Sequence, residues 1–208
     1  KYNNETDTRS QYTDIGGYAY NIHTPWKFNF SLGHTIANCL AIGAEYEYAD
    51  YSSAKVTYDS FDDYNGWRNE TDDRALNNEA DRHMTGVSTF KIGAEWMVEP
   101  QVAIRAGYNY VSSPFKNGSF ANQTINSASL DYTTSTDYMN LSGINRYTVG
   151  VGVNLKSRVY FDLACQYQHQ RGHFYAFDAL DGKGKAGCES SRINLSRTQV
   201  MMTVGYRF

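Results

Sequence analysis

The sequence predicts an all-β protein, an antiparallel up-and-down transmembrane β-barrel. Every second residue back from the C-terminus is apolar or aromatic: Phe208, Tyr206, Val204, Met202 and Val200. The intervening residues are small or polar with one exception, so the last strand has one apolar and one polar face. Similar alternating segments are joined by tight turns at one end and by long polar segments at the other. Both features are typical of bacterial outer-membrane barrels.

The composition agrees with a barrel. The mean hydropathy is only -0.59, and no run of about 18 apolar residues predicts a transmembrane helix. A barrel strand exposes only alternate residues to lipid, so a low mean hydropathy is expected. The 18 tyrosines, 10 phenylalanines and 3 tryptophans predict aromatic girdles at the membrane interfaces. A net charge of -3 gives no indication of nucleic-acid binding.

Three hairpins and a terminal strand are predicted in order along the chain. Residues 25–34 pair with 40–48, 90–96 with 102–110, and 147–155 with 159–167, and 197–208 form the last strand. The long polar segments 51–86, 112–145 and 178–194 are then outer loops, because short turns of such barrels face the periplasm. A secreted β-sandwich is the alternative, but shorter loops are expected there.

The strand count leaves two possibilities open. Seven strands are predicted, or eight if residues 15–21 form a separate strand. Single-chain bacterial barrels have even strand numbers, and an open sheet edge is not tolerated in lipid. The chain also opens in a polar stretch without an initiator Met. We therefore expect residues 1–208 to be one barrel domain, either the C-terminal part of a larger barrel or a small closed one.

A segment of the second predicted hairpin resembles a known protein family. Residues 91–115, KIGAEWMVEPQVAIRAGYNYVSSPF, resemble the C-terminal half of the FadL/TodX-like outer-membrane transport proteins. There a Leu-Gly-x-Glu-Tyr strand leads through a tight turn into an Arg-Ala-Gly-x-x-Tyr strand and a Ser-Pro. Residues 24–33, 46–52 and 203–208 also match that pattern, and the likeness covers about residues 24–208.

The resemblance implies a fourteen-stranded barrel with an N-terminal hatch that admits long-chain fatty acids or other hydrophobic compounds. This sequence holds about half of those strands and no hatch, so it is expected to be the C-terminal portion. The expected function is passive transport of hydrophobic compounds across the bacterial outer membrane. The alternative is a small structural or adhesive barrel whose long outer loops bind partners.

Charged residues on the polar strand face are candidate lumenal groups: Glu45, Glu47, Lys91, Glu95, Arg105, Asp162, Arg197 and Arg207. We hypothesise that Lys91 or Arg105 attracts a fatty-acid carboxylate through a charge-assisted hydrogen bond. The alternative is cross-strand ion pairing, for example with Glu95, that fills the barrel interior.

Aromatic residues of the outer loops are the second candidate site. Phe115, Phe120 and Phe174 are predicted to contribute to an apolar entry groove, since exposed aromatic clusters often mark binding surfaces. The alternative places Phe174, with Tyr175 and Phe177, in the outer interfacial girdle.

No enzyme, metal or cofactor is predicted. His169 and His173 have acids nearby, but His169 shares its face with Tyr167, and no nucleophile accompanies it. The cysteines Cys39, Cys165 and Cys188 follow no metal or redox spacing, and a disulfide between two of them stays open. The expected partners are the bilayer and its lipopolysaccharide, a hydrophobic small molecule, and the barrel-assembly machinery through Phe208.

Overall fold

The computed structural model describes residues 20–62, 67–117, 119, 124–126, 131–133, 137–155, 158–176 and 189–206. The strands are β1 (Tyr20–His23), β2 (Lys27–Ile36), β3 (Leu40–Asp50), β4 (Lys55–Asp62), β5 (Trp67–Asp72), β6 (Gly86–Glu99), β7 (Val102–Val111), β8 (Thr124–Asn126), β9 (Asp131–Thr133), β10 (Tyr138–Leu155), β11 (Val159–Tyr175) and β12 (Ser191–Tyr206). The helices are the 3-10 turn η1 (Tyr51–Ser53) and α1 (Arg74–His83). Among the described helices, none is long and apolar enough to cross a membrane.

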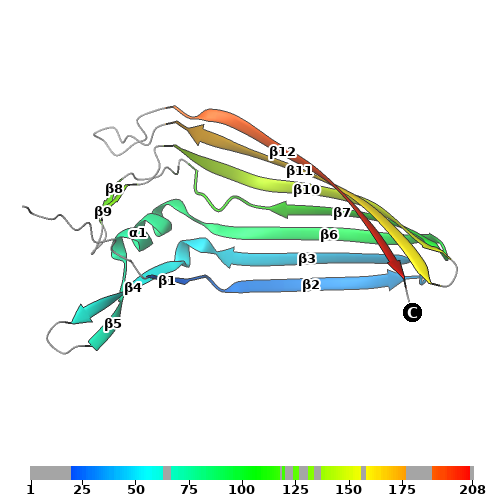
Figure 1. The fold of residues 1–208 in the computed structure, drawn as a ribbon, viewed down its shortest axis with the longest axis horizontal. Helices are drawn as coiled ribbons and strands as arrows, with labels where there is room; N and C mark the ends of the chain where they lie inside the picture. Colours follow the sequence, from blue (N-terminus) through cyan, green and yellow to red (C-terminus); the bar gives the residue numbers. More distant parts are fainter. Residues whose placement is uncertain are drawn as a thin grey trace, which may run out of the picture.

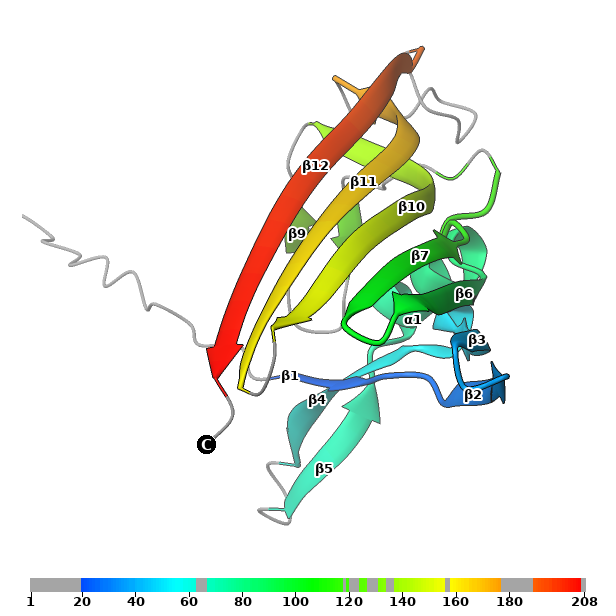
Figure 2. The same cartoon turned by 90° about the vertical axis from the view of Figure 1, so that its right-hand side faces the viewer.

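One seven-stranded antiparallel sheet dominates the structure, in the order β12-β11-β10-β7-β6-β3-β2 (Figure 1). Neighbouring strands follow one another along the chain, apart from the excursions that carry β4, β5, α1, β8 and β9. The prediction of an antiparallel up-and-down β protein is therefore confirmed at the level of this sheet. Its strands follow an arc when viewed along their length (Figure 2), and β2 and β12 are the edges within the described residues.

The register separates the side chains into two faces. We call the face that bears Glu45, Lys91 and Arg105 the polar face, and the opposite one the apolar face. Large side chains of the apolar face are solvent-exposed, with Leu32 84 % and Met202 74 % exposed. The buried side chains of the sheet, by contrast, lie on the polar face: Ala49, Val87, Ala103 and Gln170. Side chains converge on the concave side of a curved sheet, so the polar face is the concave one.

The first hairpin closes through a tight turn of unusual composition. Cys39 N donates to Ile36 O at 3.1 Å, and the central residues Ala37 and Asn38 have φ of 49° and 55°. Two successive positive φ values define a type I′ turn, whose twist matches that of the flanking strands. Asn tolerates this conformation, whereas Ala37 is strained in it.

The prediction that residues 51–86 form a long loop was wrong, because this segment contains strands and a helix. Within residues 51–86, β4 and β5 form a separate three-stranded sheet with β1, and α1 follows. β1 therefore pairs with β4 and adds no eighth strand to the main sheet, and residues 15–19 lie outside the described part. The side chain of Asp73 caps α1 by accepting from Leu76 N at 3.1 Å.

Two predicted loop boundaries also need correction. β10 begins at Tyr138, inside the predicted loop 112–145, and β12 begins at Ser191, inside the predicted loop 178–194. β11 ends at Tyr175, beyond the strand end predicted at residue 167 but before the predicted loop. The register of the β10–β11 pair shifts between Leu141 and Ile144, and polar residues occupy both faces beyond this irregularity. The alternation that marks a strand in the sequence is lost there, although backbone pairing continues.

Candidate functional site

A row of polar side chains crosses the polar face from β2 to β12. Its cross-strand partners are, in order, Ser31, Glu45, Lys91, Asn109, Arg146, Gln168 and Arg197. Lys91 Nζ lies 2.7 Å from Glu45 Oε1 and joins β6 to β3. Arg146 donates to Asn109 Oδ1 at 3.0 Å and to Gln168 Oε1 at 2.9 Å, so β7, β10 and β11 are tied together at the same level.

A second charged group lies nearer to the turn end of the sheet. Arg105 Nε is 2.5 Å from Glu95 Oε2 on β6, and Arg105 Nη1 is 2.5 Å from Asp162 Oδ1 on β11. The second contact passes over β10 at Gly152. One guanidinium thus bridges two carboxylates through charge-assisted hydrogen bonds.

Four glycines lie between these two charged groups. Gly33, Gly43, Gly93 and Gly107 are successive cross-strand partners on β2, β3, β6 and β7. A Cβ atom added at the first three would meet no atom closer than 3.6 Å, so this strip of the polar face carries no side chains and is open. At Gly107 the hydroxyl of Thr148 covers the backbone, 2.7 Å from the added Cβ position.

The predicted carboxylate-binding cations are both engaged by acids. Lys91 pairs with Glu45, and Arg105 pairs with Glu95 and Asp162, which is the arrangement that the ion-pair alternative describes. Ligand binding by Lys91 or Arg105 stays a prediction. Arg197 lies on the polar face of β12 as expected, and Arg207 lies outside the described residues.

The predicted aromatic groove residues are separated. Phe115 forms an isolated β-bridge with Met84 at the end of α1 and lines a hollow of about 400 Å³ together with Tyr175 and His173. Phe174 is half-buried and shares the polar-face parity of Gln170, so it points to the other side of the sheet from Tyr175. Phe120 and Phe177 lie outside the described residues.

An aromatic belt crosses the apolar face. It comprises Phe30, Tyr46, Phe90, Tyr108, Tyr110, Tyr147 and Tyr167, which are successive or diagonal partners from β2 to β11. The rings of Tyr108 and Tyr147 lie 5.2 Å apart. Nearer to the turns, Trp96, Phe161 and Tyr206 are again exposed aromatics on the same face. The positions between these two levels are mainly aliphatic.

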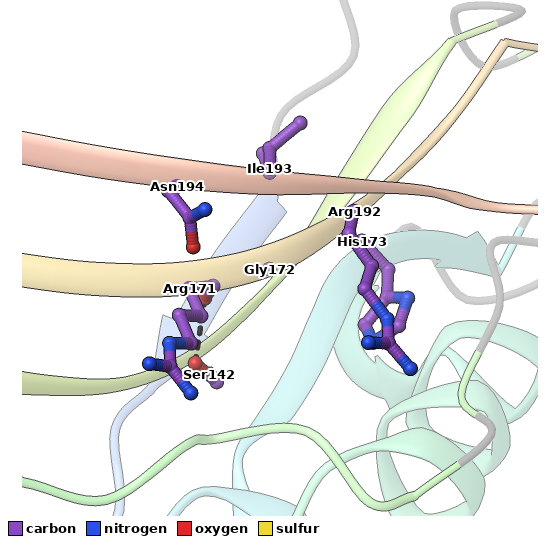
Figure 3. Close-up of a pocket in the computed structure, with 7 residues that line it drawn as sticks. All are labelled: Ser142, Arg171, Gly172, His173, Arg192, Ile193 and Asn194. Carbon is purple, nitrogen blue, oxygen red and sulfur yellow. Dashed lines mark hydrogen bonds between the residues drawn. The ribbon is translucent and has the colours of Figure 1, made fainter.

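Beyond the belt, three strands form a pocket of about 460 Å³ at the loop end of the sheet (Figure 3). It is lined by Ser142, Arg171, Gly172, His173, Arg192, Ile193 and Asn194. Arg192 and Asn194 are the cross-strand partners of His173 and Arg171, and all four share the parity of the apolar face. The Ile193 side chain points the opposite way in Figure 3.

The described part of the chain contains no disulfide and no cluster of metal ligands. Cys39 and Cys165 are free, and Cys165 lies on the apolar face opposite Val200; Cys188 lies outside the described residues. No group of three or more His, Cys, Asp or Glu residues is arranged to hold a metal ion in the described ranges. His169 lies on the apolar face as predicted, opposite Ser196.

Sequence reasoning missed two sets of residues. Asn109, Arg146 and Gln168 belong to the polar row, and continuing the period-2 pattern to Arg146 would have found them. Arg171 and Arg192 lie beyond the strand ends that the hydrophobic alternation marks. The sequence pattern therefore did not indicate on which face of the sheet they lie.

Comparisons with known protein families, curated proteins and solved structures gave no match to the chain. The two faces of the main sheet and its loop end are therefore the features that bear on function.

Proposed function

We propose that this chain forms part of the wall of a bacterial outer-membrane β-barrel that lets hydrophobic compounds, such as long-chain fatty acids, pass passively. The observation that carries the proposal is the division of one curved antiparallel sheet into a convex apolar face and a concave polar face. A water-soluble sheet of this curvature would bury its apolar face against a second layer. Here the large apolar side chains of that face are exposed, from Trp26 to Tyr206.

The dimensions of the apolar band support insertion into a bilayer. On β11 the alternating apolar positions run from Val159 to Tyr167, a nine-residue stretch, and a transmembrane β-strand needs roughly 9–11 residues. The aromatic belt bounds this band on one side and Trp96, Phe161 and Tyr206 bound it on the other. Aromatic side chains favour both membrane interfaces.

The concave face supports a polar interior. Its charges are joined in the Lys91–Glu45 and Arg105–Glu95–Asp162 contacts, which keeps charged groups away from lipid and ties neighbouring strands together. The open glycine strip between them gives a solute room next to the wall. The choice of hydrophobic compounds as solutes rests on the FadL/TodX resemblance of residues 91–115.

Uptake measurements test the proposal. The full-length natural protein is expressed in a Gram-negative strain that lacks its own long-chain fatty-acid channel, and entry of labelled oleate is followed. Faster entry than in cells with an empty vector is expected, together with an outer-membrane protein whose gel mobility changes on heating. A correctly inserted, heat-modifiable barrel that leaves oleate entry at the vector level would overturn the transport role.

A second function, a small adhesive or structural barrel, is favoured by one observation. The β1–β4–β5 sheet and α1 extend beyond the loop end of the main sheet (Figure 1) and offer an ordered surface for a partner. The native mass separates the two proposals. A native barrel of 23.6 kDa supports the adhesive role, whereas a species about twice that size supports a half-barrel segment of a transporter.

A further inference from the structure

The loop-end pocket lies on the membrane-facing side of the sheet, although its lining is cationic. Arg171, His173 and Arg192 share the face of Tyr167 and Leu163, because the β11–β12 register runs without interruption from Val159 to Phe174. Residues of this face below the belt are apolar and exposed. The face therefore changes from aliphatic to aromatic to cationic along a single strand.

The depth of the pocket can be estimated from the strand. Arg171 is four residues beyond Tyr167, or about 13 Å along the strand at roughly 3.3 Å per residue. With a strand tilt of about 40°, this places Arg171 roughly 10 Å above the aromatic belt. His173 and Arg192 lie one residue pair further out. This is the level of lipid headgroups and the sugars attached to them rather than of hydrocarbon.

The cations of the pocket are available to a ligand. Within the described residues, no hydrogen bond or ion pair engages the guanidinium group of Arg171 or Arg192; only the backbone carbonyl of Arg171 is used, by Ser142 Oγ at 2.6 Å. His173 Nδ1 interacts with Ser190 Oγ at 2.9 Å. On the polar face, by contrast, the guanidinium groups of Arg105 and Arg146 each contact two neighbouring side chains.

The side chains and the volume of the pocket suit a ligand with a phosphate group and a sugar. Two guanidinium groups on adjacent strands, with His173 directly opposite Arg192, suit a phosphate group, which arginine binds through paired hydrogen bonds. Ser142 and Asn194 add donors and acceptors that suit sugar hydroxyls. A volume of about 460 Å³ exceeds what a phosphate alone fills and leaves space for part of a sugar.

We propose that Arg171, His173 and Arg192 bind the phosphate of a phosphorylated glycolipid in the outer leaflet of the membrane. This inference rests on the proposed function, because it requires the apolar face to contact lipid with the loop end outward. The ligand reaches the pocket from the membrane side, since the pocket is on the apolar face and the solute path is on the polar face. The bound headgroup would hold β10, β11 and β12 at a fixed depth.

The test compares two variants of the full-length protein purified from outer membranes in mild detergent. Arg171→Gln with Arg192→Gln removes both guanidinium groups of the pocket, whereas Arg197→Gln removes one from the polar face of the same β12 strand. Phosphorylated glycolipid bound per protein is quantified by mass spectrometry of the intact complex. We expect the control to retain the lipid as the wild type does and the double variant to bind it at least about tenfold less tightly.

Two further experiments separate the possible causes. Arg171→Lys with Arg192→Lys should recover part of the binding, because charge is kept while the paired geometry is lost. Inorganic phosphate, titrated against the lipid-free protein, should bind far more weakly than the glycolipid; equal binding would overturn the lipid as the source of the phosphate. Unchanged glycolipid binding by the glutamine double variant would overturn the site itself.

Heat-modifiability and oleate entry are measured in the same preparations. If the double variant is inserted and transports normally but the wild type carries no glycolipid, the inference fails while the proposed function stands. If the wild type is not found in the outer membrane, the proposed function itself fails, and the inference fails with it.

Discussion

Arg105 and Asp162 form an ion pair across an intervening strand. Arg105 Nη1 on β7 lies 2.5 Å from Asp162 Oδ1 on β11, and β10 runs between these strands. The contact is allowed because β10 carries Gly152 at the crossing point. A Cβ atom there would lie 2.6 Å from Asp162 Oδ1 and 3.0 Å from Arg105 Nη1.

Gly152→Ala is therefore expected to destabilise the protein by displacing the Asp162 carboxylate. The pair is partly exposed, so the loss should be about 1 kcal/mol in the free energy of unfolding. Urea unfolding in detergent micelles measures it. Gly43→Ala is the matched control, because its Cβ would meet only the backbone oxygen of Leu32, at an ordinary contact distance of 3.8 Å. Equal effects of the two substitutions would argue against the crossing contact.

Arg105→Ala should reduce fatty-acid entry more than entry of an uncharged solute. Removal of the guanidinium leaves the carboxylates of Glu95 and Asp162 without their cation, so the polar face becomes more negative and repels an oleate anion. A several-fold loss for labelled oleate is expected, with little change for an uncharged hydrophobic dye. Unchanged oleate entry would dispose of a role for Arg105 in transport.

The strands of the main sheet were predictable because one face alternates strictly. Phe28, Phe30 and Leu32 on β2, and Val200 to Tyr206 on β12, each mark a strand by period 2, and the structure has strands at both places. Tight turns such as that after Ile36 then determine which strands pair. The register follows, because a slip by one residue would put every apolar side chain on the polar face.

The remaining structure was not predictable from that pattern. Beyond Leu141 on β10 and Tyr167 on β11, polar and apolar side chains are mixed on both faces, so pairing continues without a period-2 hydrophobic signal. One side chain fastens α1 to β4: Asn77 accepts from Val56 N at 2.7 Å and donates to Val56 O at 3.1 Å. A side-chain amide that pairs with the backbone of a strand, as a neighbouring strand would, produces no periodic pattern in the sequence. The loop-end pocket lies in the same unmarked region.

Met202→Arg should prevent correct assembly if the apolar face contacts lipid. Met202 is 74 % exposed on β12, and an arginine at the lipid face near the membrane midplane costs roughly 2–4 kcal/mol. The yield of heat-modifiable protein in outer membranes measures the effect. Thr203→Arg places the same charge on the polar face of the same strand and should be tolerated. A normal yield for Met202→Arg would contradict lipid contact at this face.

Ala37→Gly should stabilise the first hairpin. Ala37 has a φ of 49°, a conformation that costs an L-residue roughly 1–2 kcal/mol and costs glycine little. After allowance for the entropy of glycine in the unfolded chain, a gain of about 0.5–1 kcal/mol in the free energy of unfolding is expected. Gln101→Gly in the β6–β7 turn is the control, since Ala37 and Asn38 are the non-glycine residues with positive φ in the described part. A loss of stability from Ala37→Gly would contradict the type I′ geometry.

The β1–β4–β5 sheet should loosen in acid because of Glu70. The hydroxyl of Thr57 donates to the Glu70 carboxylate, and His23 Nε2 lies 3.0 Å from it; these contacts hold the pKa of Glu70 below its ordinary value of 4.5. The folded state therefore favours the ionised form, so its contribution is complete above pH 4.5 and is lost as the pH falls through the lowered pKa. Amide hydrogen exchange in β1 and β4 should accelerate over this range beyond the intrinsic pH dependence. Glu70→Gln should remove that extra acceleration, and its persistence in the variant would assign the effect to another group.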